Sequence, residues 1–316
     1  MGGLSPTGRI IIWLYYCSLL SGFYYARDCG FIMKLNLSPE TTETIINKAI
    51  EGSKLLSLAT VQSAGSRRDQ DVYHLDSESP AGLHLSGDKT VSNDTLSRIT
   101  IALEPLYKDL AFSDKEFADG SALVTALMER LPNAIGAGID ELALYGPKNP
   151  DGAKASVPNM SSVTDNLNAA EPTVLNGTLA PYIATQDAVS NNGDDFDGWL
   201  LDRKAQSDLR TAYLANNSGL SIAQQGIDDG FNLLGSPAFF RKGITRANSV
   251  DGKYAGFAGP FKNLIVSIGG QIELNTYDPR VSYALHKSNQ FVVSAMLFVG
   301  VQVVPNTKFV ALAPKA

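Results

Sequence analysis

The sequence predicts an α+β fold, and three stretches of the 316-residue chain support this prediction. Apolar residues recur every three or four positions across residues 121–145, which is the spacing of one face of a long helix. Residues 291–304 and 309–312 are almost entirely apolar, which is typical of buried strands. Residues 63–98, in contrast, are polar and rich in Ser, Asp and Gly, and they contain too few apolar residues for a core of their own.

The N-terminal segment, residues 1–32, differs from the rest of the chain. Its apolar run from Ile10 to Ala26 follows Arg9 and resembles a signal-peptide core or a short membrane anchor. The run is shorter than the ~20 residues of a full membrane span, and no small-x-small cleavage site follows it. We interpret this segment as an over-extended start or an appended piece, and we expect the mature protein to begin at or after Met33. A genuine export or anchoring signal is the alternative.

The first predicted helix begins at the sequence Ser38-Pro39-Glu40. The Ser side chain can cap free amides, Pro suits the first turn, and the acid suits the positive end of the helix. Gly52 weakens the helix near its end. The apolar stripe of this helix consists of Ile45, Ile46, Ala49 and Ile50.

The polar stretch 63–98 is predicted to form two extended strands joined in a long arm. A Ser-Pro-Ala-Gly turn sequence at residues 79–82 separates its short apolar pieces. Because the arm cannot bury itself, it is either flexible or lies on a neighbouring molecule. Its apolar residues are Val72, Tyr73 and Leu75 in the first strand, and Leu83 and Leu85 in the second.

A half-buried strand is predicted where Ile99, Ile101 and Leu103 alternate with other residues, and Pro105 interrupts it. The helix over 121–145 follows. At 1.5 Å per residue this helix would be roughly 35–40 Å long.

The long helix has recognisable limits. The capping box Ser113-Asp-Lys-Glu116 opens the helical region, and Gly146-Pro147 ends it. Pro132 should kink the helix, because proline removes one backbone hydrogen bond.

The middle of the chain mixes helix and loop signals. Residues 147–178 are rich in Asn, Ser and Pro and are predicted to be loop. A short helix is expected over 181–189, and Asp195 is expected to cap a second long helix over 196–214. Residues 220–260 are turn-rich.

Strands return towards the C-terminus. Apolar residues alternate over 264–268, the pair Gly269-Gly270 is expected to turn the chain, and the pattern resumes at Ile272. A polar loop over 275–290 then leads into the apolar closing strands.

Composition separates this chain from two classes of protein. The chain has a net charge of −6 and a pI near 5.1, so it lacks the excess of Lys and Arg that is typical of a nucleic-acid-binding protein. If such a protein surrounds DNA, we expect it to enclose the DNA without gripping it. Both cysteines, Cys17 and Cys29, precede Met33, so no disulfide framework holds the body of the protein.

No motif supports catalysis. The sequence contains no GxSxG, HExxH, Walker or CxxC pattern. The acids Asp194, Asp195 and Asp197 are interpreted as helix caps. No cysteine accompanies the three histidines, so they do not predict a metal site. We therefore predict a protein that is not an enzyme and has no cofactor or metal. The histidines are His74, His84 and His286.

Five local sequences occur in a characteristic order along the chain. They are residues 99–146, FDGWLLDRKAQSDLRTAYLANNSG at 196–219, Leu233-Leu-Gly-Ser-Pro237, Gly259-Pro-Phe-Lys-Asn-Leu-Ile265 and residues 291–312. Together they resemble the major capsid proteins of tailed bacteriophages with the Hong Kong 97 fold. In that family the corresponding parts are the strand and spine helix, the A-domain helix, a Leu-Gly-x-Pro turn, a Gly-Asp-Phe strand entry and the closing strands. Pro260 stands where an Asp is common.

The resemblance covers roughly residues 33–313 and implies a Hong Kong 97-type capsid fold. Such a fold combines an N-arm, an extended E-loop, a long spine helix, a P-domain β-sheet and an α/β A-domain. The implied parts are the doubtful apolar segment 1–32, N-arm 33–62, E-loop 63–98, P-domain strand and spine helix 99–150, A-domain 151–260 and P-domain return strands 261–316.

The resemblance also implies a function. The protein would be a structural major capsid protein of the virion, which assembles in the host cytoplasm into an icosahedral shell enclosing double-stranded DNA. Its partners would be other copies of itself in pentamers and hexamers, a separate scaffolding protein, a portal, and DNA held without sequence-specific contact, with no membrane involved. The implied subunit-interface residues are Val72, Tyr73, Leu75, Leu83, Leu85 and Lys89.

Some members of this family crosslink their subunits through an E-loop Lys, a P-domain Asn and a nearby Glu. Lys89 and Asn289 are available here, but no acid occurs from Gln290 to Val304, so crosslinking is not expected. Two other functions stay open. A bacterial nanocompartment shell shares the fold, and an exported or anchored surface protein would suit the apolar N-terminal segment.

Overall fold

The computed structural model describes ten stretches of the chain, which fall into two compact units. The described residues are 32–35, 39–65, 69–77, 95–113, 120–149, 153–169, 171–215, 230–241, 254–277 and 290–315. The first unit comprises Met1–Ala49, Leu106–Ile135 and Gln271–Leu297, and the second comprises Ile50–Pro105, Gly136–Gly270 and Phe298–Ala316.

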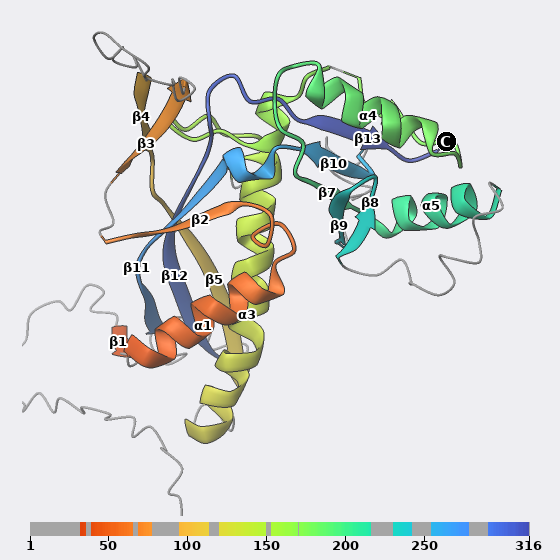
Figure 1. Ribbon diagram of the computed structural model, residues 1–316. Coiled ribbons are helices and arrows are strands. Elements are labelled where there is room, and N and C mark those ends of the chain that lie inside the picture. The colour runs from red at the N-terminus through yellow and green to blue at the C-terminus, as the bar shows by residue number, and fades with distance from the viewer. Residues whose placement is uncertain are drawn as a thin grey trace, which may run out of the picture. The chain divides into compact units, whose positions relative to one another are not determined.

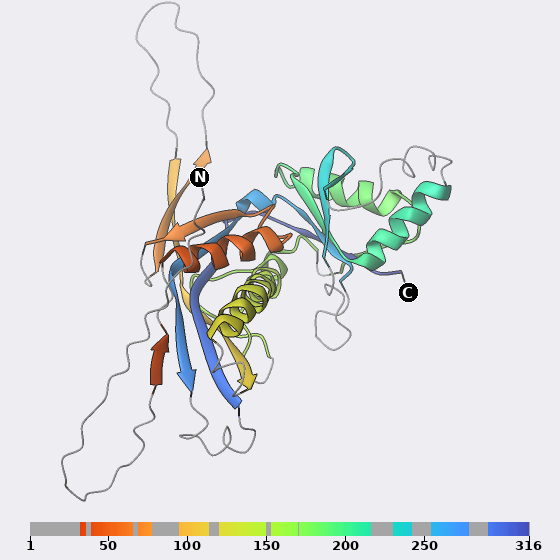
Figure 2. The ribbon, with the colours of Figure 1, turned by 90° about the horizontal axis from the view of Figure 1, so that it is seen from below.

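A five-stranded sheet is built around two long strands, β11 (Leu264–Tyr277) and β12 (Gln290–Val303), which run side by side in Figure 2. Strand β5 (Glu104–Ser113) lies beyond β12. On the other side of β11, β2 (Thr60–Ala64) pairs in parallel with its first half and β1 (Ile32–Leu35) pairs antiparallel with its second half.

Two predictions about these strands are wrong in detail. The chain does not turn at Gly269-Gly270, because β11 continues through both residues, and Gly270 adopts a φ of 73°, which glycine tolerates. Strand β12 is not buried throughout. Buried residues such as Val293 and Leu297 alternate with half-buried ones along much of its length, as expected when one face packs on a core.

The long helix is confirmed as α3 (Gly120–Tyr145), the yellow-green helix of Figure 1. Pro132 lies inside it, and Gly146 follows its last residue with a φ of 79°, which is the left-handed conformation that commonly ends a helix. Its described apolar positions Leu131 and Ile139 are fully buried. The predicted N-terminal helix is likewise confirmed as α1 (Pro39–Gly52), whose stripe buries Ile45 and Ala49.

Replacing Leu131 with Asp should prevent soluble folding of the subunit. The side chain is inaccessible to solvent, so the substitution removes apolar burial and forces a carboxylate out of water. We expect a loss of several kcal/mol, measured as the yield of soluble protein and its melting temperature. Glu129→Asp, at an exposed position of the same helix, should leave both unchanged. Normal yield of Leu131→Asp would contradict the buried position.

A second sheet has six strands in the order β6-β13-β10-β7-β9-β8. Helices α4 (Ala180–Ser190) and α5 (Arg203–Ala215) lie beside it (Figure 1). The hydroxyl of Tyr182 in α4 donates to the carbonyl oxygen of Ala205 in α5 at 3.3 Å. The strands are β6 (Thr173–Val174), β7 (Gly198–Leu201), β8 (Phe231–Leu233), β9 (Ser236–Phe240), β10 (Gly256–Gly259) and β13 (Val310–Ala313). Trp199 lies at the centre of the core between helices and sheet, where it contacts the rings of Tyr182 and Phe196.

The helix predicted over 196–214 is two elements. Residues 198–201 form strand β7, which is buried along its whole length between β10 and β9, and helix α5 begins only at Arg203. Apolar residues at the strand and at the following helix happen to fall at helical spacing, so the periodicity extended across the boundary. The short helix predicted over 181–189 is confirmed as α4.

Two of the acids before β7 bind backbone amides, and Asp195 does not cap a long helix, since α5 begins only at Arg203. Asp197 accepts hydrogen bonds from the amides of Phe261 and Lys262 at 2.7 and 2.8 Å, and Asp194 accepts one from the amide of Lys308 at 3.1 Å. Burial raises the pKa of Asp197, although the two amides oppose that rise. These carboxylates therefore tie loops together across long sequence separations.

A buried ion pair lies within the second unit. The Nε atom of Arg241, just after β9, is 3.0 Å from Oδ2 of Asp140 in α3, and the hydroxyl of Ser53 donates to the other carboxylate oxygen. Burial raises the pKa of Asp140, and Arg241 and Ser53 only partly oppose this effect. The pair links three distant parts of the sequence.

Among the described residues, no helix is both long and apolar enough to cross a lipid bilayer.

Candidate subunit interface

The predicted arm contains a two-stranded antiparallel ribbon. Strand β3 (Gln70–Ser77) pairs with β4 (Thr95–Ile101), and the second strand expected around residues 83–85 lies outside the described residues. Because side chains alternate along a strand, the register assigns each residue to one of two faces. Val72 lies opposite Ile99 on one face, and Tyr73 lies opposite Arg98 on the other.

The inner face of the ribbon packs into the second unit. Val72 is half-buried against a core cluster, and the hydroxyl of Ser267 on β11 hydrogen-bonds the side chain of Gln70. These contacts hold the ribbon on the sheet, so the arm has an anchored base. The buried residues of the cluster are Ile99, Ile101, Ile265 and Val304.

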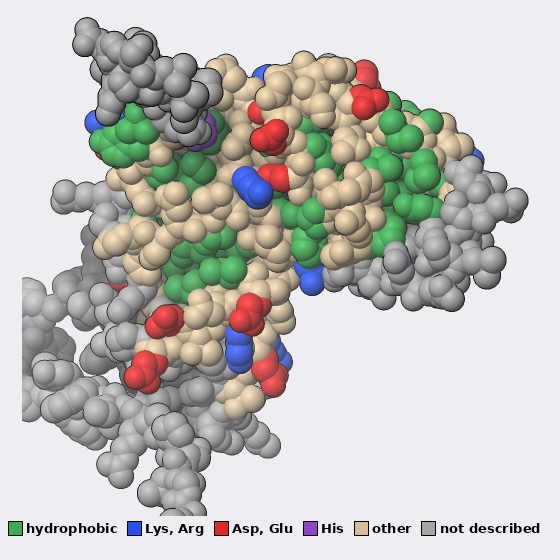
Figure 3. Space-filling view, viewed as in Figure 1, with side chains coloured by type: hydrophobic (Ala, Val, Ile, Leu, Met, Phe, Trp, Pro, Cys, Tyr) green, Lys and Arg blue, Asp and Glu red, His purple; other side chains and the backbone are tan. Residues whose placement is uncertain are grey.

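The outer face carries two large apolar side chains in solvent. Tyr73 is 64% exposed and Leu96 is 62% exposed, and apolar atoms are visible at the surface over the ribbon in Figure 3. Leu75 lies directly opposite Leu96 in the ladder. An exposed aromatic beside an exposed aliphatic side chain favours contact with another macromolecule.

Polar residues fix the base of the same face. The carboxylate of Asp71 lies 3.3 Å from Nε of Arg98 and accepts a hydrogen bond from the hydroxyl of Thr100 at 2.7 Å. This cross-strand group orients Arg98 beside Tyr73. We call the set Asp71, Tyr73, Leu96 and Arg98 the outer ribbon face.

The six residues predicted for the interface do not share one surface among the residues that the structure describes. Tyr73 is exposed on the outer ribbon face, whereas Val72 points to the inner face and the core. For Leu75 the structure gives its backbone pairing. The others, Leu83, Leu85 and Lys89, lie outside the described residues. Sequence reasoning missed Leu96 and Arg98, which only a known strand register could have identified.

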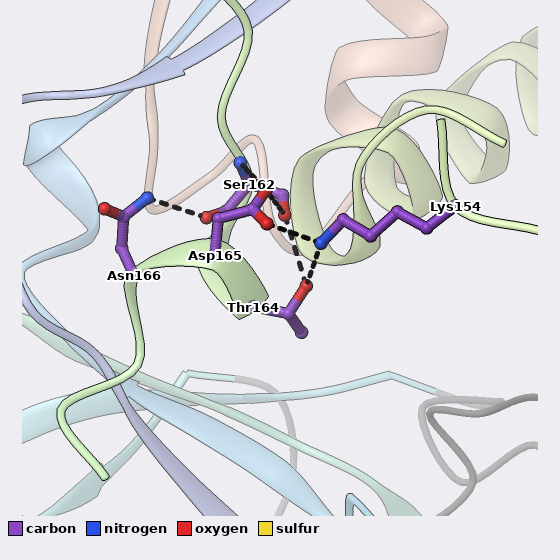
Figure 4. A network of polar contacts seen from close by, with 5 residues as sticks. All are labelled: Lys154, Ser162, Thr164, Asp165 and Asn166. Atoms are coloured by element: carbon purple, nitrogen blue, oxygen red, sulfur yellow. Dashed lines mark hydrogen bonds and ion pairs between the residues drawn. The ribbon is translucent and has the colours of Figure 1, made fainter. Parts of the chain in front are cut away.

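A polar network fixes the loop after α3 (Figure 4). The carboxylate of Asp165 accepts hydrogen bonds from Nζ of Lys154 and from the hydroxyl of Ser162, both at 2.6 Å, and the carboxamide of Asn166 donates to the carbonyl oxygen of Ser162 at 3.0 Å. Burial opposes ionisation of Asp165, but the bonds from Lys154 and Ser162 outweigh it and lower its pKa. The hydroxyl of Ser162 is buried, so the network orders the backbone and presents no accessible nucleophile.

Comparison with known proteins gives one family. The model described as "Phage capsid family" matches residues 35–313. No curated protein matches this sequence.

Several solved structures share the fold. A chain of Gordonia phage Cozz is 17% identical with a TM-score of 0.59, covering 84% of this chain and 87% of that chain. A chain of Mycobacterium phage Ogopogo is 18% identical with a TM-score of 0.56, covering 82% and 91%. A chain described as the capsid of an empty GTA particle is 15% identical with a TM-score of 0.54, covering 84% and 90%.

Proposed function

This chain belongs to the phage capsid family and is a structural shell protein of a virion. From that premise we propose that it is the major capsid protein. As such, it self-assembles into an icosahedral shell that encloses double-stranded DNA. The family match over residues 35–313 is the observation that carries the proposal. The subunits would form pentamers and hexamers in the host cytoplasm, with a separate scaffolding protein and a portal.

The elements of the chain support an assignment of the family's parts. We assign residues 33–62 to the N-arm, 63–98 to the E-loop and α3 to the spine helix. We assign residues 151–260, with α4 and α5, to the A-domain and the return strands of 261–316, with β11 and β12, to the P-domain sheet, although β13 of that last segment pairs within the six-stranded sheet.

We assign the outer ribbon face to contact with a neighbouring subunit. Its inner side is fixed by Val72 and Gln70, so the outer side presents Tyr73 and Leu96 on a supported strand pair. Fully burying an exposed side chain of this size stabilises a contact by about 1.5–3 kcal/mol. A closed shell repeats the contact at every subunit, so a modest gain per contact is sufficient.

The test replaces both apolar residues of the outer ribbon face. Tyr73→Ser with Leu96→Ser should give a subunit with an unchanged melting temperature that forms no closed shells in negative-stain micrographs, because the contact is lost but the core is intact. The control Val72→Ala lies one residue away on the inner face. It should lower the free energy of unfolding by about 1–2 kcal/mol. Normal shells from the double variant would contradict the interface assignment.

The content of purified particles tests the proposal that the shell encloses double-stranded DNA. Nuclease-treated shells purified from infected cells should release double-stranded DNA when they are denatured. Shells that contain protein cargo and no nucleic acid would instead indicate a nanocompartment.

Mature shells should be held together by non-covalent contacts. Isopeptide formation needs a carboxylate to accept the proton of the attacking Lys amine, and no Asp or Glu occurs from Gln290 to Val304. Particles boiled in detergent and reductant should therefore run as a single band at the monomer mass on a denaturing gel. A ladder of heavier bands that disappears in Lys89→Ala would show that a more distant acid, such as Glu273 or Asp278, serves the reaction.

A further inference from the structure

The exposed side of helix α5 is basic, although the chain as a whole carries a net charge of −6. The exposed residues on this side lie at positions i, i+1, i+4, i+7 and i+8 of the helix, counted from Arg203, and these positions form one continuous face. All of them are exposed to solvent. We call this set, Arg203, Lys204, Ser207, Arg210 and Thr211, the basic face of α5.

The acidic residues of this region lie outside the set that forms the basic face. Asp208 is half-buried on the flank of the helix, where its carboxylate accepts a hydrogen bond from the hydroxyl of Tyr182 at 3.3 Å. Asp202, just before the helix, is buried. Within the described part of the chain, no ion pair is formed by Arg203, Lys204 or Arg210. The five residues of the basic face therefore include three cations and no carboxylate, and half-buried Asp208 lies at its edge, four residues after Lys204.

The stability of the subunit does not explain this arrangement. Arg203 and Lys204 occupy the first turn of α5, where the positive end of the helix dipole disfavours cations by typically ~0.3–1 kcal/mol each. A face that costs the isolated subunit stability is better explained by a partner of opposite charge.

The side-chain types indicate which polyanion fits. The face combines guanidinium, ammonium and hydroxyl groups, which are the groups that bind phosphate oxygens of nucleic acids. It contains no exposed apolar residue, whereas the centre of a protein–protein interface is depleted in charge and enriched in aromatic side chains. Arg203 and Arg210 are about 10 Å apart along the helix axis, a span over which duplex DNA presents several phosphates.

We propose that the basic face of α5 contacts the phosphate backbone of the double-stranded DNA enclosed by the shell. This inference rests on the proposed function and adds to it the surface that touches the DNA. The contact is local and independent of base sequence, because the remainder of the acidic chain repels the duplex. Three phosphate contacts give an affinity that falls about 40-fold between 50 and 200 mM salt.

The experiment measures binding of the purified full-length subunit to a fluorescent mixed-sequence DNA duplex as a function of salt. The test variant is Arg203→Ser, Lys204→Ser, Arg210→Ser. The matched control, Lys48→Ser, Lys108→Ser, Arg130→Ser, removes the same charge at exposed positions elsewhere. The test variant should lose most of the binding at 50 mM salt, and the slope of log affinity against log salt should fall by about 2–3. The control should keep most of the affinity and the slope of the original protein.

A second measurement separates binding from folding. The melting temperature of the test variant should equal or exceed that of the original protein, because two cations leave the positive end of the helix. Equal losses of DNA affinity in both variants would overturn the proposal, as would absence of binding by the original protein at 50 mM salt. If the test variant binds DNA normally but forms no shells, the basic face contacts another copy of the chain, and the proposal is also wrong. Failure of the original protein to form shells would instead count against the proposed function.

Discussion

Replacing Asp140 with Ala should lower the free energy of unfolding by about 3–5 kcal/mol. The substitution removes the carboxylate that lies 3.0 Å from Nε of Arg241 and leaves a guanidinium buried without its charge partner. It also removes the acceptor of the Ser53 hydroxyl. A weaker hydrogen bond remains, from Arg241 to the carbonyl oxygen of Ala137 at 3.4 Å, and it cannot compensate for the lost charge. Denaturant unfolding of the unassembled subunit measures the effect.

A double substitution should recover much of that loss. Burial raises the pKa of Asp140 despite the nearby Arg241, which indicates that the charged carboxylate is costly to bury even when paired. Replacing both partners, with Asp140→Leu and Arg241→Met, removes the desolvation cost together with the attraction. The double variant should therefore be markedly more stable than the sum of the losses of Asp140→Leu and Arg241→Met, each made alone, predicts. Additive losses would show that the two side chains do not interact energetically.

The ion pair of Lys148 with Glu141 supplies the comparison. Its atoms are also 3.0 Å apart, but both side chains are partly exposed to solvent. Glu141→Ala should cost under about 1 kcal/mol, because water and salt screen an exposed pair. An equal cost at both sites would mean that burial does not determine the strength of the Asp140–Arg241 pair.

Replacing Gly300 with Ala should destabilise the subunit by about 3 kcal/mol or more. A Cβ atom at this position of β12 would lie 2.3 Å from the carbonyl oxygen of Ala102 and 2.7 Å from Cγ2 of Ile101. Rotation of a side chain cannot relieve the contact with a backbone oxygen, so the strand and the β4–β5 connection must move apart. Overpacking of a core typically costs about 1–3 kcal/mol, and an immovable backbone neighbour places this site at or above the upper end.

A glycine in open space is the matched control. A Cβ at Gly65 meets nothing within 4 Å, so Gly65→Ala should change stability by less than about 1 kcal/mol. The melting temperature of Gly300→Ala should fall by at least about 6 °C in a chain of this size. Equal melting temperatures for the two variants would show that β12 is not held close to Ala102.

Helices with one apolar face were the most predictable part of this fold. Apolar residues recur every three or four positions in both α1 and α3, so side-chain spacing alone predicts both helices. Both occur where the sequence indicates. The strand β7 was missed because Trp199 and Leu200 stand at helical spacing from Phe196, and only pairing with β10 and β9 makes the strand favourable. Such pairing joins residues distant in sequence, so local patterns do not contain it.

The candidate interface was predictable to a similar extent. An arm too polar to bury itself was evident, and Tyr73 was correctly placed in a strand of that arm. The pairing of β3 with residues 95–101 was not predicted, because no local signal identifies the partner of a strand, and Leu83 and Leu85 of the predicted second strand lie outside the described residues. The separation of Val72 from Tyr73 follows from strand alternation, but which face meets the core depends on Ile265 and Val304, far along the chain.

The position of Trp199 makes the protein its own fluorescent reporter. The chain contains two tryptophans, Trp13 and Trp199, so a form that begins at Met33 has a single indole emitter. That indole is fully buried in the six-stranded sheet, and its Nε1–H donates to the carbonyl oxygen of Leu233 at 3.1 Å. A shift of its emission to longer wavelength would report the opening of this sheet specifically. Light scattering recorded on the same sample would report assembly, so the two events can be timed separately without attaching a dye.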